Sequence, residues 1–245
     1  MTDNNLIALV TGGNAGIGYH LSRQLAAAGV RVLLGSRDPA RGAAASEELT
    51  AQGLDVEPIT LDVTDDATIA AAVKHVTDAY GRLDILLNNA AIVGDGLPPT
   101  SVTRESLLQT FDTNTAGIAA VTNAFLPLLR ASARARILNV SSELGSTRLV
   151  SDPDWVHSSV AATAYQASKS ALDMLTVLYA KELASENISV LSVSPGYRAT
   201  GLSNGAPTPG AGDPAEGAAA IVAIALAAES RTGQFFSDQG EVVPW

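Results

Sequence analysis

Short apolar segments alternate with longer alanine-rich segments along the chain, and this alternation restricts the fold more than any other feature. The apolar segments are rich in leucine and β-branched residues and nearly continuous in hydrophobic character, which is typical of strands covered on both faces. They occupy residues 6–10, 30–35, 56–61, 83–88, 136–141 and 188–193. This strand–helix rhythm predicts an α/β fold with a doubly wound, mostly parallel sheet of about seven strands and helices on both faces.

The predicted elements follow one another without a linker, repeat or charge block that would divide them. A chain of 245 residues is long enough for one large α/β domain, and we expect residues 1–245 to form a single domain. Two helix starts are marked clearly, at Asp38–Pro39 and Asp213–Pro214. Each pairs an N-cap aspartate with a proline at the first helical position.

Composition excludes several kinds of site. The chain is 47% hydrophobic and 16% charged, so it can bury a sizeable core and is too apolar to be disordered. It has no cysteine, which excludes disulfides and thiolate nucleophiles and is compatible with a reducing cytoplasm. The three histidines, at positions 20, 75 and 157, are scattered, and we expect no metal site.

Charge and hydropathy limit the partners. The formal net charge of −10 argues against nucleic acid and anionic membranes, and any anionic ligand would need a local source of positive potential. The segment MTDNNLIALV lacks the basic start and long apolar run of a signal peptide. Apolar stretches such as residues 219–228 are too short to span a bilayer. We expect a cytoplasmic protein that acts on a small molecule.

A glycine-rich segment, TGGNAGIG at residues 11–18, directly follows the first predicted strand. Here Gly12, Gly16 and Gly18 lie between a strand and the next helix. Glycine permits the tight turn and lets backbone N–H groups approach a phosphate at a helix N-terminus. Loops use glycine for other reasons too, but the position in the first βα turn favours dinucleotide binding.

Tyr165 and Lys169 lie four residues apart in the segment YQASK, so on a helix they would share one face. Such a pair is either an ordinary surface neighbourhood or a tuned proton donor. An ammonium about 4 Å from the phenol, at an effective dielectric constant near 20, is worth at most about 4 kcal/mol. It could lower the tyrosine pKa from about 10 by up to about three units.

Six motifs occur in a fixed order: TGxxxGIG at 11–18, NNAA at 88–91, TNTAG at 113–117, NVSS at 139–142, YQASK at 165–169 and PGYRAT at 195–200. Together they resemble a classical short-chain dehydrogenase/reductase over essentially the whole chain. The segments SRDPARG and TGQFFSDQGEVVPW are most similar to the carbonyl reductases. The resemblance implies a single Rossmann-fold domain that binds NAD or NADP.

The resemblance also implies four catalytic residues. Carbonyl reduction needs a hydride from nicotinamide and a proton for the forming alkoxide, and Tyr165 would donate that proton. Lys169 would act on the phenol and touch the cofactor ribose. Ser142, preferred over Ser141 because of its spacing from the next glycine, would hold the substrate carbonyl. Asn114 would hold a water for proton relay behind Lys169, unless it only bonds backbone groups.

The end of the second predicted strand bears on the choice between NAD and NADP. An NAD site usually has an acidic residue about 20 residues past the glycines. Asp38 has that spacing, but as the N-cap before Pro39 it would engage its carboxylate locally. The resemblance places Ser36 at the discriminating position and Arg37 after it. Arg37 could hold a 2′-phosphate or be a solvated loop residue. We expect NADPH/NADP, with NAD less favoured.

The rest of the expected cofactor site comes from the resemblance. Asp62, followed by Val63, would contact the adenine amino group. Ala91 replaces the usual glycine of the NNAG motif, which loosens the match slightly. With Ser36, Arg37, Tyr165 and Lys169, the expected cofactor-binding residues are Gly12, Asn14, Gly16, Ile17, Gly18, Asn89, Ala90, Pro195, Gly196, Arg198 and Thr200.

These features favour an NADPH-dependent oxidoreductase that reduces a ketone or aldehyde. The substrate should be apolar, since the sequence has no cluster of arginines that would bind an acidic substrate. One alternative is an NAD-dependent secondary-alcohol dehydrogenase. Another is a non-catalytic dinucleotide sensor with a protein partner, against which the complete catalytic set argues.

The segments 116–129 and 170–183 are apolar nearly all round, so each must bury a second face. In classical relatives these helices pair across a two-fold axis; in carbonyl-reductase-like relatives an insertion covers them and the chain is monomeric. The insertion here, residues 143–164 with SDPDWVHSSV at 151–160, is short. We expect it to shape the substrate mouth and leave a homodimer, with a monomer as the alternative. Trp155 and His157 could line the mouth or pack in the loop, and packing is favoured for His157.

Overall fold

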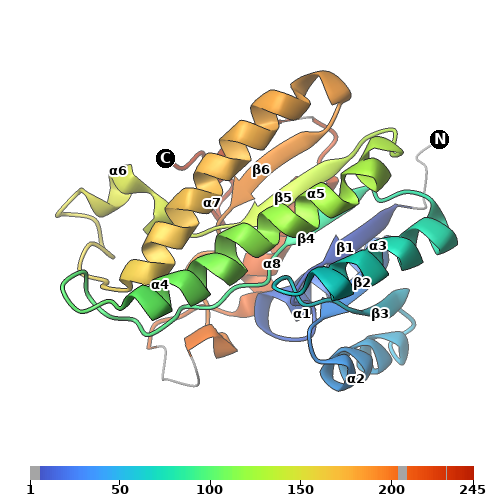
Figure 1. Cartoon of the computed structure of the whole chain (residues 1–245), viewed down its shortest axis with the longest axis horizontal. Coiled ribbons are helices and arrows are strands. Elements are labelled where there is room, and N and C mark those ends of the chain that lie inside the picture. The colour runs from blue at the N-terminus through green and yellow to red at the C-terminus, as the bar shows by residue number, and fades with distance from the viewer. Residues whose placement is uncertain (1–5, 204–208, 230) are drawn as a thin grey trace.

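The computed structural model describes residues 6–203, 209–229 and 231–245 and shows a three-layer αβα arrangement (Figure 1). The strands pair in parallel in the order β3-β2-β1-β4-β5-β6-β7. The predicted strands are confirmed with ends shifted by at most two residues, and the sheet gains a short seventh strand. The strands are β1 Ile7–Val10, β2 Arg31–Ser36, β3 Val56–Thr60, β4 Ile85–Asn88, β5 Arg136–Val140, β6 Ser189–Val193 and β7 Phe235–Phe236.

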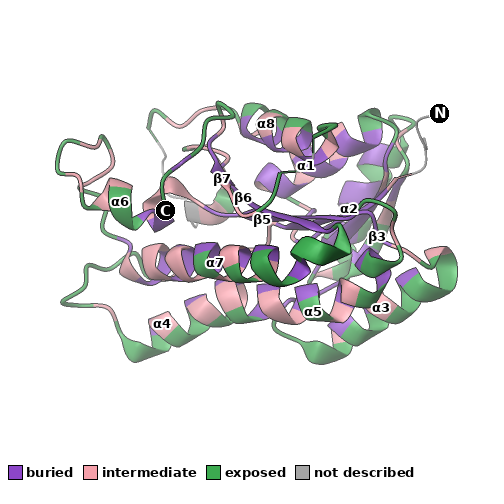
Figure 2. Cartoon of the chain, turned by 90° about the horizontal axis from the view of Figure 1, so that it is seen from above, coloured by how far each residue is buried: buried purple, intermediate pink, exposed green. Residues whose placement is uncertain are grey.

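Helices cover both faces of the sheet, as Figure 2 shows with the sheet seen edge-on. Residues of α1 (Gly16–Ala27), α2 (Pro39–Thr50) and α8 (Pro214–Leu226) pack into the core on one face. The other face carries α3 (Asp66–Tyr80), α4 (Arg104–Phe111), α5 (Gly117–Arg130) and α7 (Thr163–Glu182). Shorter helical segments are η1 Asp112–Ala116, η2 Glu143–Gly145, α6 Thr147–Val150, η3 Leu183–Glu186 and η4 Gly201–Ser203.

Both predicted helix starts are confirmed. The carboxylate of Asp38 accepts hydrogen bonds from the backbone N–H groups of Ala40 and Arg41, at 3.0 and 3.1 Å. Asp213 accepts from the N–H of Ala215 at 2.8 Å. Each aspartate thus satisfies N–H groups that have no partner inside the helix.

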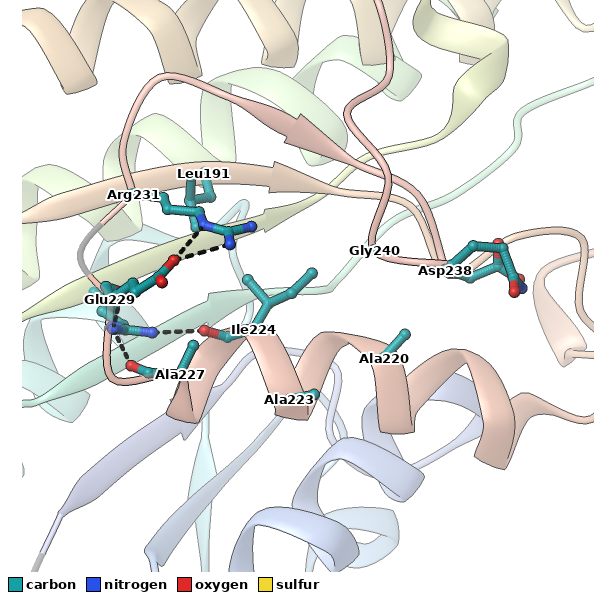
Figure 3. A pocket seen from close by; sticks show the side chains of 11 residues that line it. Leu191, Ala220, Ala223, Ile224, Ala227, Glu229, Arg231, Asp238 and Gly240 are labelled. Carbon is teal, nitrogen blue, oxygen red and sulfur yellow. Dashed lines mark hydrogen bonds and ion pairs between the residues drawn. The ribbon is translucent and has the colours of Figure 1, made fainter.

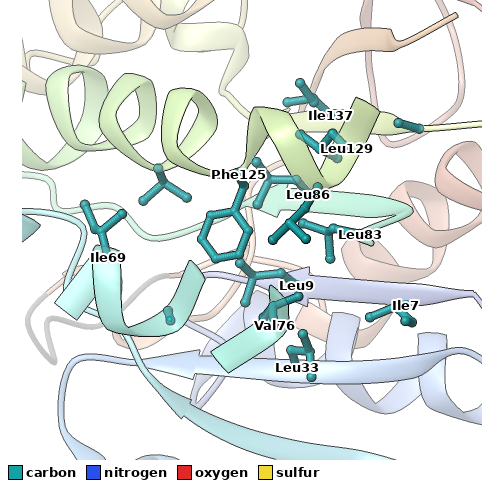
Figure 4. Close-up of a cluster of buried hydrophobic side chains, with 14 of the residues drawn as sticks. Ile7, Leu9, Leu33, Ile69, Val76, Leu83, Leu86, Phe125, Leu129 and Ile137 are labelled. Atoms are coloured by element: carbon teal, nitrogen blue, oxygen red, sulfur yellow. The ribbon is translucent and has the colours of Figure 1, made fainter. Parts of the chain in front are cut away.

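Two apolar clusters, one on each face of the sheet, hold the layers together. Figure 4 shows the cluster around Phe125, which has no exposed surface and packs among residues of α3, β1 and β4 such as Ile69, Leu9 and Leu86. Burial of a large apolar side chain contributes about 1.5–3 kcal/mol. The strands between the clusters are therefore fixed from both sides, which gives the loops at their ends a rigid support.

The helical segment from α4 to α5 contains one widened turn. Residues Asp112–Ala116 form a single π-helical turn between α4 and α5. π turns inside α-helices often occur at functional sites, and this turn carries the buried Asn114.

Arg136, at the start of β5, closes the C-terminal end of α8. Its side chain is buried and donates to the carbonyls of Ile224 and Ala225, at 2.5 and 3.0 Å, and of Glu229 at 2.8 Å. A guanidinium at this position complements the partial negative charge of a helix C-terminus. Burial lowers the pKa of Arg136 to about 10, which still leaves it charged at neutral pH.

A cavity of about 290 Å³ lies beside this helix end (Figure 3). Its charged lining is already paired, since Arg136 caps α8 and Arg231 bonds Glu229 at 2.9 Å. The alanines Ala220 and Ala223 form part of its floor. The residues that line the cavity therefore serve to hold the end of α8, and we assign no ligand to the cavity.

Candidate active site

A second cavity, of about 430 Å³, lies at the carboxyl edge of the sheet. The strand order reverses between β1 and β4, and ligands of doubly wound sheets bind at such a switch point. Most of the residues predicted from the sequence line this one space: Gly12, Asn14, Gly16, Ile17, Gly18, Ser36, Arg37, Asp62, Val63, Asn89, Ala90, Tyr165, Lys169, Pro195 and Thr200.

The turn between β1 and α1 requires its glycines. Gly12 has a φ of +63°, a left-handed conformation that favours glycine. A Cβ atom on Gly18 would lie 2.1 Å from the carbonyl oxygen of Gly12, so no other residue fits without moving the turn. The residue before α1, Ala15, offers no side-chain cap, and the first turn of α1 has no acidic residue. The free N–H groups of this helix start therefore give the cavity an anion-binding end.

Thr11 and Asn89 join the turn to the end of β4. The Thr11 hydroxyl accepts from the N–H groups of Asn89 and Ala90, at 2.9 and 3.0 Å. In return the Asn89 amide donates to the carbonyls of Thr11 and Gly12, at 2.9 and 3.2 Å. Thr11 had no role of its own in the expected site, although its place directly after a buried strand was a signal that could have identified it.

Two arginines line the cavity near the end of β2: Arg37 directly after the strand and Arg41 in the first turn of α2. Asp38 is the acidic residue that could have marked an NAD site. Its Oδ1 atom accepts from N–H groups at the start of α2, and its Oδ2 atom lies 3.5 Å from the Arg41 guanidinium. The buried Ser36 hydroxyl donates to the Asp38 carbonyl at 2.8 Å. Local engagement of Asp38 is thus confirmed. Arg41 was missed because it belongs to the next helix, where it reaches back one turn.

At the end of β3, Asp62 lines the cavity. Its Oδ1 atom accepts from the backbone N–H and the hydroxyl of Thr64, at 3.0 and 2.8 Å. Its own N–H donates to the Thr68 hydroxyl at 3.0 Å. These bonds fix the carboxylate at the wall of the cavity.

Tyr165 and Lys169 lie on α7 at the inner end of the cavity and are almost fully buried, with 9% and 2% exposure. The Lys169 Nζ atom donates to the Val140 carbonyl at 2.7 Å and lies 5.6 Å from the centre of the Tyr165 ring. Burial lowers the pKa of Lys169 to about 8. The pair is therefore no surface neighbourhood.

The tyrosine pKa moves in the direction opposite to the one expected from the sequence. Burial raises the pKa of Tyr165 to about 12, against the lowering effect of a hydrogen bond with Ser142. The ammonium does not act alone on the phenol: Lys169 donates to the Val140 carbonyl, and burial removes water from the phenol. At neutral pH the phenol consequently keeps its proton.

Asn114 is buried behind this pair rather than in the cavity wall. Its Oδ1 accepts from the N–H of Ile92 at 2.9 Å. Its Nδ2 donates to the Ile92 carbonyl at 2.8 Å and to the Ser168 hydroxyl at 3.0 Å. The side chain thus bonds backbone groups, as the second interpretation of the sequence held, and fixes the start of the loop after β4 against α7.

Ser141, and not Ser142, lines the cavity itself. Ser142 follows at the end of β5 and contacts the Tyr165 phenol, while its hydroxyl also accepts from the N–H of Leu144 at 3.3 Å. The hydroxyl that touches the phenol is therefore the one that the resemblance selected.

Gly196 and Arg198 are not brought to the cavity wall. The Arg198 guanidinium donates to the Pro195 carbonyl at 2.7 Å, to Glu216 at 3.1 Å and to Asp238. These partners turn the side chain toward the start of α8 and the C-terminal segment. A Cβ on Gly196 would lie 2.5 Å from an Asp238 oxygen, so Asp238 packs closely on this turn.

The segment 151–160 reaches the loop after β6 through aromatic contacts. The His157 ring meets Trp155 edge to face at a centroid distance of 5.3 Å and lies 6.1 Å from Tyr197. Burial and Asp238 raise the pKa of the neighbouring Glu143 carboxyl, while His157 lowers it. The role of this segment in the substrate mouth stays a prediction.

Residues 6–208 match the family model of the short chain dehydrogenases. The chain belongs to the short-chain dehydrogenase family. Short-chain dehydrogenase anuI of Penicillium roqueforti is 35% identical over 245 residues, which cover 97% of this chain and 96% of that protein. An NADPH-bound carbonyl reductase from chicken fatty liver superimposes with a TM-score of 0.86 at 27% identity, covering 97% of this chain and 98% of the other. A variant of actinorhodin polyketide ketoreductase with NADPH gives 0.81 at 27% identity, covering 96% of each chain.

As a short-chain dehydrogenase, the protein is an oxidoreductase of Rossmann fold, and the family uses nicotinamide dinucleotides. This confirms the resemblance and the fold class. No helix in the described part of the chain is long and apolar enough to cross a membrane. Within the same residues, no group of three or more His, Asp or Glu side chains is placed to hold a metal ion.

Proposed function

We propose that this short-chain dehydrogenase uses NADPH to reduce a ketone or aldehyde to an alcohol, with Tyr165 as the proton donor and residues 1–245 acting as one domain. The observation that carries the proposal is geometric: the buried phenol of Tyr165 and the buried ammonium of Lys169 lie together in the wall of the cavity. The NADPH-bound carbonyl reductase and ketoreductase structures support the same chemistry. The absence of cysteine fits a cytoplasmic location.

The cavity fits a nicotinamide dinucleotide, which would supply the hydride. The start of α1 offers N–H groups for the pyrophosphate, and the glycine at position 18 lets α1 begin directly against the Gly12 carbonyl and the Asn89 side chain. Asp62 and Lys169 line the cavity, and we expect them to contact the adenine and a ribose respectively. With a net charge of −10, the chain needs local cations to hold a 2′-phosphate, and Arg37 and Arg41 in the cavity wall would provide them.

In the proposed reaction, the O–H bond of Tyr165 breaks and its proton moves to the substrate oxygen as that oxygen gains negative charge. Ser142, next to the phenol, would donate to the same oxygen. Lys169 would stabilise the phenolate left behind, since an ammonium favours the charged form of a nearby phenol. Both N–H bonds of the Asn114 side chain are in use, so any relay water would have to donate a hydrogen bond to an oxygen of Asn114.

A panel of ketones and aldehydes assayed by loss of NADPH absorbance at fixed pH tests the proposal. We expect turnover with at least one apolar carbonyl and a higher kcat/KM with NADPH than with NADH. Turnover only with NAD and a secondary alcohol would favour the dehydrogenase alternative. Tight NADPH binding without turnover of any substrate would favour a sensor.

We predict that replacing Ser36 with Asp and Arg37 with Ile shifts cofactor preference toward NADH. The change removes one cation from the 2′-phosphate position and adds a carboxylate for a ribose diol. Charge-assisted hydrogen bonds are worth about 1.5–3 kcal/mol, so the NADPH/NADH ratio of kcat/KM should fall about 10- to 100-fold. Arg104→Ile, which removes an exposed arginine on α4 outside the cavity, is the matched control. An unchanged ratio would point back to Asp38.

We also propose a homodimer, through the outer surfaces of α4 and α7. The sequence favoured α5 together with α7, but the large apolar side chains of α5 are buried or half-buried. The face formed by α4 and α7 exposes Leu108, Met174 and Leu178 by 60%, 59% and 50%, and α4 packs on α7. The segment 151–160 folds toward Tyr197 instead, so it leaves the face uncovered. A second copy would bury these side chains in an isologous contact.

Light scattering at micromolar concentration should therefore give about twice the chain mass of 25.1 kDa. The double variant Met174→Glu with Leu178→Glu should give the single-chain mass, because it places charges on the apolar face. A native protein that is strictly monomeric would contradict the proposed dimer.

A further inference from the structure

A row of polar side chains crosses the sheet beneath the active site. Asn88, Asn139 and Ser192 are register partners on β4, β5 and β6. Asn88 Nδ2 donates to Asn139 Oδ1 at 2.8 Å, and Asn139 Nδ2 donates to the Thr176 hydroxyl at 2.8 Å. The Ser192 hydroxyl lies 2.9 Å from the same Thr176 oxygen. All four side chains are buried, so the row is a connected network inside the core, where polar groups need partners.

Asp173 ends this row on the side of the active site. It is 4% exposed, and its Oδ1 accepts from the Ser192 hydroxyl at 2.8 Å. Its Oδ2 and the Ser141 hydroxyl are both buried without a hydrogen bond of good geometry to a described residue. Burial raises the pKa of Asp173 to about 6, against the lowering effect of Ser141, Ser192 and Lys169. Because Ser141 lines the cavity, the carboxylate lies one side chain away from it.

Asp173 also stands one helical turn beyond Lys169 on α7, as Lys169 stands one turn beyond Tyr165. The three buried side chains thus share one stripe of the helix. The Lys169 ammonium donates to a carbonyl, and no carboxylate of the described residues lies within ion-pair distance of it. A buried ammonium is costly without a counter-charge.

The elements packed against Lys169 offer no other anion to it. On its own helix the titratable neighbours are Tyr165 and Asp173. The segment η2 packs on α7 and holds Glu143, but that carboxyl interacts with Asp238 and His157. β5 presents the Val140 carbonyl and the Ser141 hydroxyl, and η1 presents only uncharged groups next to Ser168, namely Asn114 and Thr115. Asp173 is the one charged group in the described chain that favours the ammonium form of Lys169.

We propose that Asp173 is a positioning residue for the reaction: its buried carboxylate is the counter-charge that keeps the Lys169 ammonium protonated in the neutral range, and Ser141 links it to the cavity wall. The proposal rests on the proposed function for its catalytic meaning. The effect of the Asp173 carboxylate on the Lys169 ammonium follows from their positions one turn apart on α7, and it can be measured without enzymatic turnover.

The lysine content of the chain makes a direct test practical. The chain has three lysines, Lys74, Lys169 and Lys181, so NMR of protein labelled with ¹³C at the lysine Cε should show three signals, assigned by Lys169→Arg. In the native protein we expect Lys169 to titrate near pH 8. In Asp173→Asn its midpoint should fall by about one pH unit, because an opposite charge has been removed. Lys74 and Lys181 should not move.

Ser192→Ala is the matched control, since it removes a hydrogen bond of Asp173 but leaves its charge. We expect the Lys169 midpoint to stay within a few tenths of a pH unit in this variant. An unchanged midpoint in a folded Asp173→Asn protein would overturn the proposal. So would an equal fall in Ser192→Ala and Asp173→Asn, which would make packing the cause.

If the Asp173→Asn variant does not fold, the NMR titration of Lys169 in the native protein still tests the proposal. The Lys169 signal should then show a second, smaller inflection near pH 6, where Asp173 titrates. A single-step curve would overturn the proposal.

A kinetic measurement connects the counter-charge to the reaction. If the Lys169 midpoint falls from about 8 to about 7, the charged fraction at pH 8 falls from about one half to about one tenth, so kcat/KM should fall about fivefold there and recover at pH 6. A structural defect would lower activity equally at both values. A native protein with no carbonyl turnover would refute the proposed function while leaving the NMR result intact.

Discussion

Replacing Tyr165 with phenylalanine should lower turnover by about 10²- to 10⁴-fold, the usual contribution of a positioned acid, while cofactor affinity changes little. The substitution removes one oxygen and keeps the ring that packs in the wall of the cavity. What is lost is the proton that the phenol holds at neutral pH. The measurements are kcat for the best carbonyl of the panel and the NADPH dissociation constant from fluorescence.

Tyr179→Phe is the matched control for this variant. Tyr179 lies on the same helix, and its hydroxyl donates to Asn123 at 2.8 Å, away from the cavity. We expect its kcat to remain near that of the native protein. A near-normal kcat in Tyr165→Phe would refute the assignment of the proton donor.

Lys169→Ala should damage two properties together, turnover and cofactor affinity. The ammonium would stabilise the phenolate and would also contact the ribose, so we expect kcat to fall about 100-fold or more and the NADPH dissociation constant to rise about 10-fold. The variant also leaves the buried Asp173 carboxylate without its nearby cation. It should therefore be less stable than the native protein in thermal unfolding at pH 8.

Lys181→Ala, at an exposed position on the same helix, is the control. If only kcat falls in Lys169→Ala and the NADPH dissociation constant stays the same, the ribose contact is wrong. If both stay the same, the catalytic role fails as well.

The strands could be located from the sequence because they are buried on both faces, which leaves an uninterrupted apolar signature. β7 could not, since its two residues, Phe235 and Phe236, are too few for a pattern. Asp38 was identified as a helix cap because the proline that follows it is a local signal. A helix start of this kind can be predicted from two or three neighbouring residues alone.

Features that depend on distant partners were not readable. Arg198 is held by Asp238, 40 positions away, and the sequence carries no mark of that pairing. The same holds for Asp173, which looks like an ordinary polar position of an amphipathic helix until β6 brings Ser192 against it. The direction of the Tyr165 pKa also depends on burial, which spacing along the helix does not reveal.

The widened turn at Asp112–Ala116 joins two helices, α4 and α5, that pack against different neighbours. Such a turn holds one extra residue, and one residue advances an α-helix by about 100°. Asn114 is buried in this turn, as are Thr110 before it and Ile118 after it. The buried stripe of α4 faces α7, whereas that of α5 faces α3 and the sheet. A deletion of one residue in this turn would restore a regular α-helix, and Asn114 would lose the position from which it bonds Ile92 and Ser168.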